Sequence, residues 1–356
     1  WNGTAGSKWS TTSGGAGGAA EPTAADDVKF DGNSGTGTVT VITVTGKCRS
    51  LIFTGFTGTF DNQRQVDIGD GTVGNYTLST GMTYNDAGGA IQFVSTVSTN
   101  NITTNGKTVG DTLKFGTDGG TGGTWALQDA LTISATGTRQ LQLNGGTLTT
   151  NGNSVSTRLL IHQGLGDVTL NLGASAVTIN GSSGVVWDWD GATPGSTLNA
   201  GTSTITLSDA SASAHTFGGS GRTYNNMNIT GGGSGIVTIK GSNTFADFPQ
   251  IVGGTKSVRF VAGTTQTYTG GADFGNGTNL ITIDSSVAGT AATLSRTGET
   301  VSADYLSLKD STAAGTTPFY AGINSTNVSG NTNWTFTVPP VAGGGVSATA
   351  MLIGVG

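Results

Sequence analysis

The chain of 356 residues contains a single cysteine, only 6 prolines and only 10% charged residues. Cys48 alone cannot close an internal disulfide, and we expect it to be a small buried side chain on an early strand. No apolar run reaches the ~18 residues of a transmembrane helix, so no helical membrane span is expected. The few prolines and the lack of a strict glycine period exclude a collagen-like chain.

Basic charge is also scarce, and this excludes two further classes of protein. The 15 lysines and arginines are scattered, and the net charge of −6 lacks the basic patch that a nucleic-acid binder needs. His162 and His215 have no cysteine or carboxylate nearby at a metal-ligand spacing. Asp67–Gly71 and Asp118–Gly120 match neither the EF-hand nor the nonapeptide calcium repeat. We therefore expect neither a metal nor a cofactor.

What the chain does have is a regular alternation of apolar and polar residues, maintained from about Val39 to about Phe336. Apolar residues alternate with polar ones in short runs that return at roughly 7 to 12 residues, which is typical of strands followed by tight turns. No helical stripe is visible, and the 62 glycines disfavour one. The clearest runs are Leu131/Ile133, Leu141/Leu143, Leu159/Ile161, Val168/Leu170/Leu172, Val177/Ile179, Ile205/Leu207 and Val237/Ile239.

This spacing fits a sandwich, a barrel or a solenoid, and the length of the chain separates them. A single sandwich or barrel of this length would need about 30 short strands, more than one sheet unit holds. A solenoid has no such limit, because each coil stacks only on its neighbours. We predict an all-β, right-handed parallel β-helix (β-solenoid) with about 10 to 12 imperfect coils of about 25 to 30 residues.

The ends differ from the middle, which predicts three segments. Residues 1–38, with Trp1 and Trp9, are loop-rich and are expected to form an irregular N-terminal cap. Residues 39–337 form the solenoid, and residues 338–356 form an extended C-terminal tail.

The tail begins at Pro339-Pro340, which prevents a strand from continuing. It is uncharged and contains Met351, Leu352 and Ile353. One interpretation is a frayed terminus. The other is an assembly tail that becomes ordered against a neighbouring copy or a larger assembly.

Several blocks combine short apolar stretches with turn-forming residues such as glycine, asparagine or aspartate. They are Gly3–Asp31, Arg222–Met227, Gly241–Phe245, Phe260–Thr265, Ala303–Ser311 and Gly330–Trp334. In these blocks the chain resembles large repetitive surface proteins of bacteria and the tail or fibre proteins of their phages. The resemblance implies a β-solenoid on a virion or cell surface. It implies no catalytic residues, because the shared positions are core and turn residues.

One constellation has the residue types of a carbohydrate site. If Val185–Asp190 is a strand, Trp187 and Trp189 share one face, and Asp188 and Asp190 lie on the other, about 6.6 to 6.8 Å apart. That separation suits the paired acids of an inverting glycosidase, and tryptophans suit sugar rings. Alternatively, Val185 points into the core and the tryptophans, which lie on the same face of the strand, do so too. The aspartates are then exposed to solvent.

Other catalytic patterns are weaker. Serine and aspartate are abundant, and triads follow no fixed order, so counting alone leaves a Ser-His-Asp triad open. No Gly-x-Ser-x-Gly elbow leads into an expected helix. The runs Gly231–Gly233 and Gly343–Gly345 lack the Lys-Ser/Thr ending of a phosphate loop and are interpreted as turns.

The function expected from these patterns is a non-enzymatic structural or adhesive appendage, a phage fibre or capsid decoration at the virion surface. The alternatives are a bacterial cell-surface adhesin or fibril subunit, and a carbohydrate-active β-helix enzyme acting on a surface polysaccharide. Open strand edges predict a homo-oligomer, with a trimer as one candidate. Other virion or cell-surface proteins and surface glycans are the expected partners.

Overall fold

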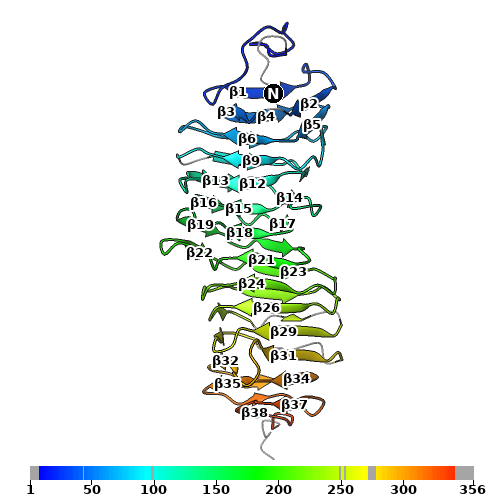
Figure 1. Ribbon diagram of the computed structural model, residues 1–356, viewed down its shortest axis with the longest axis vertical. Coiled ribbons are helices and arrows are strands. Elements are labelled where there is room, and N and C mark those ends of the chain that lie inside the picture. Colours follow the sequence, from blue (N-terminus) through cyan, green and yellow to red (C-terminus); the bar gives the residue numbers. More distant parts are fainter. Residues whose placement is uncertain are drawn as a thin grey trace, which may run out of the picture.

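The computed structural model describes residues 8–42, 44–97, 100–247, 250–251, 254–271 and 278–340. Within these ranges every regular element is a strand, and all pairing between named strands is parallel. The strands stack as successive coils along one axis, from the N-terminal to the C-terminal end (Figure 1). The predicted all-β parallel β-solenoid is therefore confirmed.

Each coil passes three sides in turn, and one side is a continuous sheet of thirteen strands that we call the long face. Its strands are β3 (Gly46–Cys48), β6 (Gln65–Ile68), β9 (Ala90–Phe93), β12 (Thr112–Phe115), β15 (Leu141–Leu143), β18 (Leu160–His162), β21 (Gly184–Asp188), β24 (His215–Gly218), β26 (Ile236–Lys240), β29 (Lys256–Phe260), β31 (Ile281–Ser285), β34 (Leu306–Lys309) and β37 (Thr326–Ser329).

The second side consists of an eight-stranded sheet followed by a four-stranded one. The first holds β1 (Asp27–Asp31), β4 (Ser50–Thr54), β7 (Tyr76–Thr77), β10 (Asn100–Thr103), β13 (Thr124–Leu127), β16 (Gly146–Thr149), β19 (Val168–Asn171) and β22 (Thr197–Asn199). The second holds β27 (Thr244–Phe245), β30 (Thr265–Tyr268), β32 (Ala292–Arg296) and β35 (Ser311–Gly315).

The third side holds sheets of three, seven and three strands. In chain order these are β2 (Thr38–Val41), β5 (Thr59–Asn62) and β8 (Thr83–Tyr84); β11 (Thr108–Val109), β14 (Leu131–Ile133), β17 (Val155–Thr157), β20 (Ala176–Ile179), β23 (Thr204–Leu207), β25 (Asn226–Ile229) and β28 (Gln250–Ile251); and β33 (Val301–Ser302), β36 (Phe319–Tyr320) and β38 (Trp334–Thr335).

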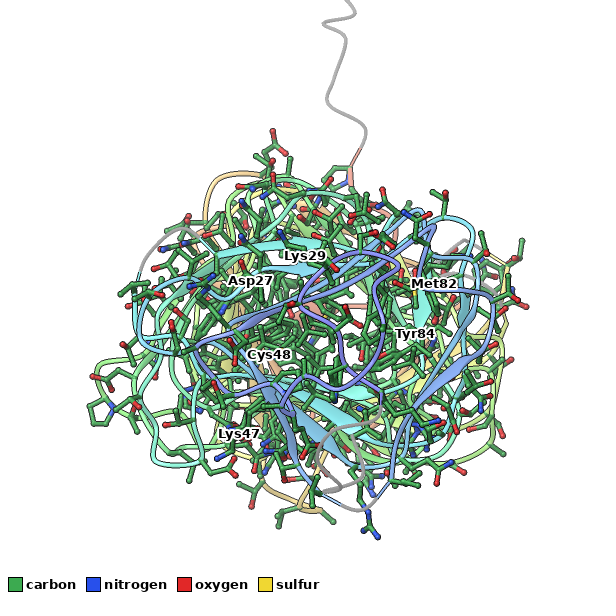
Figure 2. All side chains as sticks on the ribbon, turned by 90° about the horizontal axis from the view of Figure 1, so that it is seen from above. Asp27, Lys29, Lys47, Cys48, Met82 and Tyr84 are labelled. Atoms are coloured by element: carbon green, nitrogen blue, oxygen red, sulfur yellow. The ribbon has the colours of Figure 1, made fainter. Side chains whose placement is uncertain are left out.

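The core is one column of buried side chains that runs from Val28 to Trp334. Alternation along each strand turns every second residue inward, and parallel register stacks like on like from coil to coil. The ring centroids of Phe93 and Phe115 are 4.8 Å apart, and those of Trp187 and Phe217 are 5.5 Å apart. Seen along the axis, side chains fill the space inside the coils (Figure 2). Cys48 is fully buried on β3, as predicted.

Asparagine makes some of the tight turns between sides. Asn105 and Asn151 have φ angles of 50° and 55°, in the left-handed region that asparagine tolerates better than most residues. Asn105 Nδ2 donates to the Leu78 carbonyl at 2.7 Å, and Asn151 Nδ2 donates to the Leu127 carbonyl at 3.0 Å, each in the preceding coil. These side chains therefore form the turn and also tie it to the coil before it.

The coils are more numerous and less even than the sequence predicts. One strand per coil on the long face gives thirteen coils instead of 10 to 12. Residues paired in adjacent coils are only 19 apart at Leu141 and Leu160, but 31 apart at Gly184 and His215. About half of the coils are therefore shorter than the 25 to 30 residues expected, and the extra length of the others is taken up in loops.

The two ends of the described chain can be compared with the predicted N-terminal cap and C-terminal tail. In the N-terminal segment, Trp9 packs on Phe30 with the ring centroids 5.9 Å apart, and β1 pairs with β4. The right-handed winding and the capping role of this segment stay predictions. At the other end β38 stops at Thr335, and the predicted assembly residues Met351, Leu352 and Ile353 lie outside the described residues.

Candidate functional site

An open groove of about 460 Å³ lies at the start of the long face, across four coils. Its floor is the small-residue segment Gly88-Gly89-Ala90, which leads into β9. The coil before it contributes Gln65, and the coil after it contributes Lys114. Successive strands are only ~4.8 Å apart, so a segment with almost no side chains lies directly between long side chains of the neighbouring coils. The space that its missing side chains would fill is the hollow of the groove.

The floor must stay small. A Cβ on Gly89 would collide with the backbone of Arg64 and with Asn62. Gly88 has a φ of 86°, and a Cβ there would lie 2.9 Å from the guanidinium of Arg139. Glycine is therefore required here both for its backbone angle and for the space it leaves.

A polar network orients the long side chains of the groove. Lys114 Nζ donates to Gln65 Oε1 at 3.2 Å, across the intervening coil. The amide nitrogen of Gln65 donates to Asp67 Oδ1 at 2.7 Å and to Gln92 Oε1 at 2.6 Å. Since both acceptors fix the direction of the amide group, the oxygen of Gln65 is the part that faces Lys114.

The lining of the groove is polar and includes no carboxylate. Four of its eleven residues are glutamines, and its two charged residues are Arg64 and Lys114. Within the described part of the chain neither of these forms an ion pair, and Arg64 Nε donates to the Ile42 carbonyl at 2.7 Å. The two cations of the groove therefore have no direct carboxylate partner, and the charge of Asp67, beside Gln65, acts on Lys114 without contact.

A buried carboxyl lies next to the groove at the corner between the third side and the long face. Asp111 is fully buried and accepts hydrogen bonds from Tyr84 at 2.7 Å and from Asn62 at 2.8 Å. Its Oδ1 has no hydrogen-bond partner. Burial raises the pKa of Asp111 to about 6, against the smaller opposing effects of these hydrogen bonds and of Arg139.

The tryptophan–aspartate constellation adopts the core arrangement that the sequence left open. Trp187 and Trp189 are both fully buried, so neither ring offers a face to a sugar. Asp188 is half-buried and accepts the backbone N–H of Asp190, whereas Asp190 pairs with Lys240 at 2.9 Å. The carboxylates are thus at the surface and the rings are not.

One expectation about this strand is wrong in detail. Val185 is only partly buried, and Val186 points into the core instead. The cause is a shift of register between Val185 and Trp187, where β21 pairs with β24. This bulge places two successive residues, Val186 and Trp187, on the inner side.

The structure also brings a serine, a histidine and an aspartate together, in an order unlike that of a catalytic triad. His162 Nε2 lies 2.9 Å from Ser196 Oγ, and the Gly164 amide donates to His162 Nδ1 at 2.8 Å. Because Nδ1 accepts, the ring proton is on Nε2 and is donated to the serine. A general base must instead accept the serine proton, and its Nδ1–H must point to a carboxylate.

The remaining contacts of Ser196 give it a structural role. Its Oγ also accepts the Val168 amide at 3.0 Å and pairs with Thr193 Oγ1 at 2.9 Å, and Thr193 in turn donates to Asp167. Burial lowers the pKa of His162, which keeps the ring neutral near pH 7. This chain of hydrogen bonds fixes the 163–167 and 189–196 loops to each other.

A second histidine belongs to a more enclosed cluster. His215 Nδ1 lies 3.8 Å from Asp209 Oδ2, and Lys256 is 1% exposed with no hydrogen-bond partner for Nζ. Burial lowers the pKa of both His215 and Lys256. Because these side chains are almost inaccessible, we interpret the cluster as an internal electrostatic feature and not as a ligand site.

Asp67 and Asp118, from the two calcium-like stretches, both contact the amides beside the groove. Asp67 accepts from Gln65, and Asp118 accepts from Gln92 at 3.0 Å. No group of three or more His, Cys, Asp or Glu side chains in the described ranges is arranged to hold a metal ion. Among the same residues, no helix is long and apolar enough to cross a membrane.

Comparison with known proteins gives no family for this chain. No protein-family model matches it, and neither curated proteins nor solved structures give a match. The functional interpretation therefore rests on the fold and the chemistry of its surface.

Sequence reasoning missed the groove. Its walls, Gln65 and Lys114, are 49 residues apart and meet only after two coils have been stacked. The available signal was the Gly-Gly-Ala segment at 88–90, flanked one coil away by glutamine and lysine at outward positions. That signal becomes visible only once the coil register is known.

Proposed function

We propose that the chain is a non-enzymatic structural and adhesive subunit of a surface appendage. The observation that carries this proposal is the unbroken column of buried side chains through thirteen coils, from Val28 to Trp334. Such a column gives a stiff rod whose length is set by the number of coils, which is what a spacer or fibre needs.

The surface chemistry supports the same proposal. With 10% charged residues, the chain covers its outside mainly with hydroxyl and amide groups. The buried groups that suggest chemistry, His162 with Ser196 and Asp209 with His215, are engaged with each other inside the fold. Within this class, the resemblance of the repeat blocks to phage fibre and bacterial surface proteins favours a phage fibre or capsid decoration, with a bacterial adhesin as the alternative.

The C-terminal end of the rod supports assembly with other copies or other surface proteins. β37 is the last strand of the long face, and all four of its side chains are exposed. Ile323 is 69% exposed and Val328 is 51% exposed, and among the described residues β37 pairs on one edge only, with β34. An open strand edge with apolar side chains pairs readily with another chain. We propose that copies associate through this end into a homo-oligomer.

The alternative of a polysaccharide-cleaving enzyme has less support. Its aromatic platform would require Trp187 and Trp189 at the surface, and both rings are buried. Its second acid, Asp190, is held by Lys240.

Immunogold electron microscopy of the native source tests the proposal. A virion component predicts label on free particles at regular positions, and an adhesin predicts label on fibrils anchored to cells. Label confined to the cell interior, or protein released only as an unassembled soluble species, would contradict an appendage role.

A further inference from the structure

The long-face groove has the shape of a site for an extended ligand. It crosses four coils, from β6 to β15, and three steps of ~4.8 Å make it about 14 Å long. It is open along its length and about 460 Å³ in volume. A chain-like molecule lying on the surface fits this form better than a compact molecule that needs enclosure.

The chemistry of the lining points to a saccharide. The glutamine amides, Gln63 and Gln140 among them, can both donate and accept, which matches hydroxyl groups that do the same. The lining includes no aromatic residue and no apolar pocket of the kind that anchors peptide side chains. Hydrogen bonding is thus the recognition that the groove offers.

The positively charged side chains of the groove indicate what charge its ligand should carry. Two other cations of the long face form ion pairs, Lys240 with Asp190 at 2.9 Å and Arg259 with Asp284 at 2.7 Å, whereas Lys47 and Lys309 form none within the described residues. In the groove, Lys114 is instead held by the uncharged oxygen of Gln65, and Arg64 by a backbone carbonyl. Both side chains are thus held by uncharged acceptors, and no carboxylate of the groove lining contacts them, which favours an anionic group on the ligand.

We propose that this groove binds an anionic oligosaccharide, with Arg64 and Lys114 contacting its acidic groups and the glutamines contacting its hydroxyls. The proposal deepens the adhesive role proposed above and rests on it. It places glycan recognition near the N-terminal end of the rod, away from the predicted Trp187–Asp190 constellation.

Binding of defined oligosaccharides to the full chain, measured by isothermal titration calorimetry, tests this inference. The probes are an oligogalacturonate, its carboxyl-reduced neutral counterpart and a sulfated oligosaccharide of the same length. We expect the two anionic probes to bind, their relative affinity showing which acidic group is preferred, and the neutral one to bind at least tenfold more weakly. Affinity should fall as salt is raised, because the cations are partly exposed.

Variants locate the site. Arg64→Met and Lys114→Met should each weaken binding roughly tenfold, since each removes one charge-assisted contact. Lys309→Met, on β34 of the same face, is the matched control and should leave affinity unchanged. Ala90→Gln fills the floor and should abolish binding, with circular dichroism showing that the coils remain intact.

Three results would overturn the inference: no binding of either anionic probe, equal loss in Lys309→Met, or equal binding of an oligoglutamate of the same charge. The last would show that the groove selects charge and not sugar. None of these results bears on immunogold localisation, so this inference can fail while the appendage role stands.

Discussion

The hydroxyl of Tyr84 donates a 2.7 Å hydrogen bond to the carboxylate of Asp111, inside the coils and against the floor of the long-face groove. Tyr76 in turn donates to the Tyr84 hydroxyl at 3.2 Å. One oxygen of Asp111 has no partner, and burial raises its pKa to about 6. A buried polar network with an ionisable carboxyl therefore lies inside the coils, and it makes the stability of the rod depend on pH.

The first prediction concerns this pH dependence. The folded-state pKa of Asp111 exceeds its unfolded value, so the folded chain binds the proton more tightly, and ionisation above about pH 6 costs stability. Asp111→Asn should therefore stabilise the chain at pH 8, by on the order of 3 kcal/mol, with the gain vanishing near pH 4. Urea denaturation at several pH values measures this. A gain that is equal at pH 4 and pH 8 would contradict the assignment.

The second prediction concerns the buried tryptophans. Trp187→Ala should destabilise the chain by about 3–5 kcal/mol, because it empties a site stacked against Phe217. Asp188→Asn, one residue away but at the surface, should stay within about 0.5 kcal/mol. Hydrogen exchange should show the loss of protection in β18, β21 and β24, with little change in β34, since coils contact only their neighbours. Uniform loss along the chain would argue against a stacked column.

The third prediction concerns Ser196. Ser196→Ala removes the acceptor for His162 Nε2–H and for the Val168 amide, which should cost about 1–3 kcal/mol for each group left unpaired. Because the histidine donates to the serine, a fluorophosphonate probe should not label Ser196. Labelling that disappears in a His162→Gln variant would reveal a nucleophile and reopen the hydrolase alternative.

The fourth prediction concerns the open C-terminal edge. Val328→Lys should shift the oligomer towards monomer in light scattering, because it replaces the one apolar side chain of the exposed strand β37 with a charge. Thr238→Lys, in the middle of the long face, is the control and should not change the mass. A wild-type chain that is monomeric at all concentrations would contradict association through β37.

Much of the fold was predictable because alternation decides which side chains point inward. Leu141/Leu143 and Ile205/Leu207 are buried pairs, as their pattern indicates, whereas Leu159/Ile161 is not, because β18 turns Leu160 and His162 inward. The coil count was not predictable, because turns of different length separate similar strands. The inward turn of Val186 depends on a bulge against β24, a partner some 30 residues away, and no local pattern reveals it.

The site was less accessible to sequence reasoning than the fold. Trp187–Asp190 stood out because tryptophan is rare in this chain, with 6 in 356 residues, yet both of its tryptophans are large rings that fill the core. The groove is made mainly of glycine, threonine and glutamine from four coils, which form no motif along the chain, and it gains its character only from stacking. Chemistry that arises between coils is invisible until the register is known.

The central claim is that successive coils add equal steps along one axis. Outward residues stack in register from Lys47 through Gln142 to Lys240, four and then eight coils along the long face. Spin labels at Lys47→Cys with Gln142→Cys, and at Lys47→Cys with Lys240→Cys, test it by electron–electron double resonance. The native Cys48 is fully buried, and burial raises its pKa, so it should escape labelling.

The expected distances are about 19 Å for the four-coil pair and about 38 Å for the eight-coil pair, at ~4.8 Å per coil. Narrow distance distributions for both pairs, with the eight-coil distance twice the four-coil distance, would establish the rod. Two similar distances, or an eight-coil distance below about 25 Å, would contradict the solenoid and the appendage role built on it.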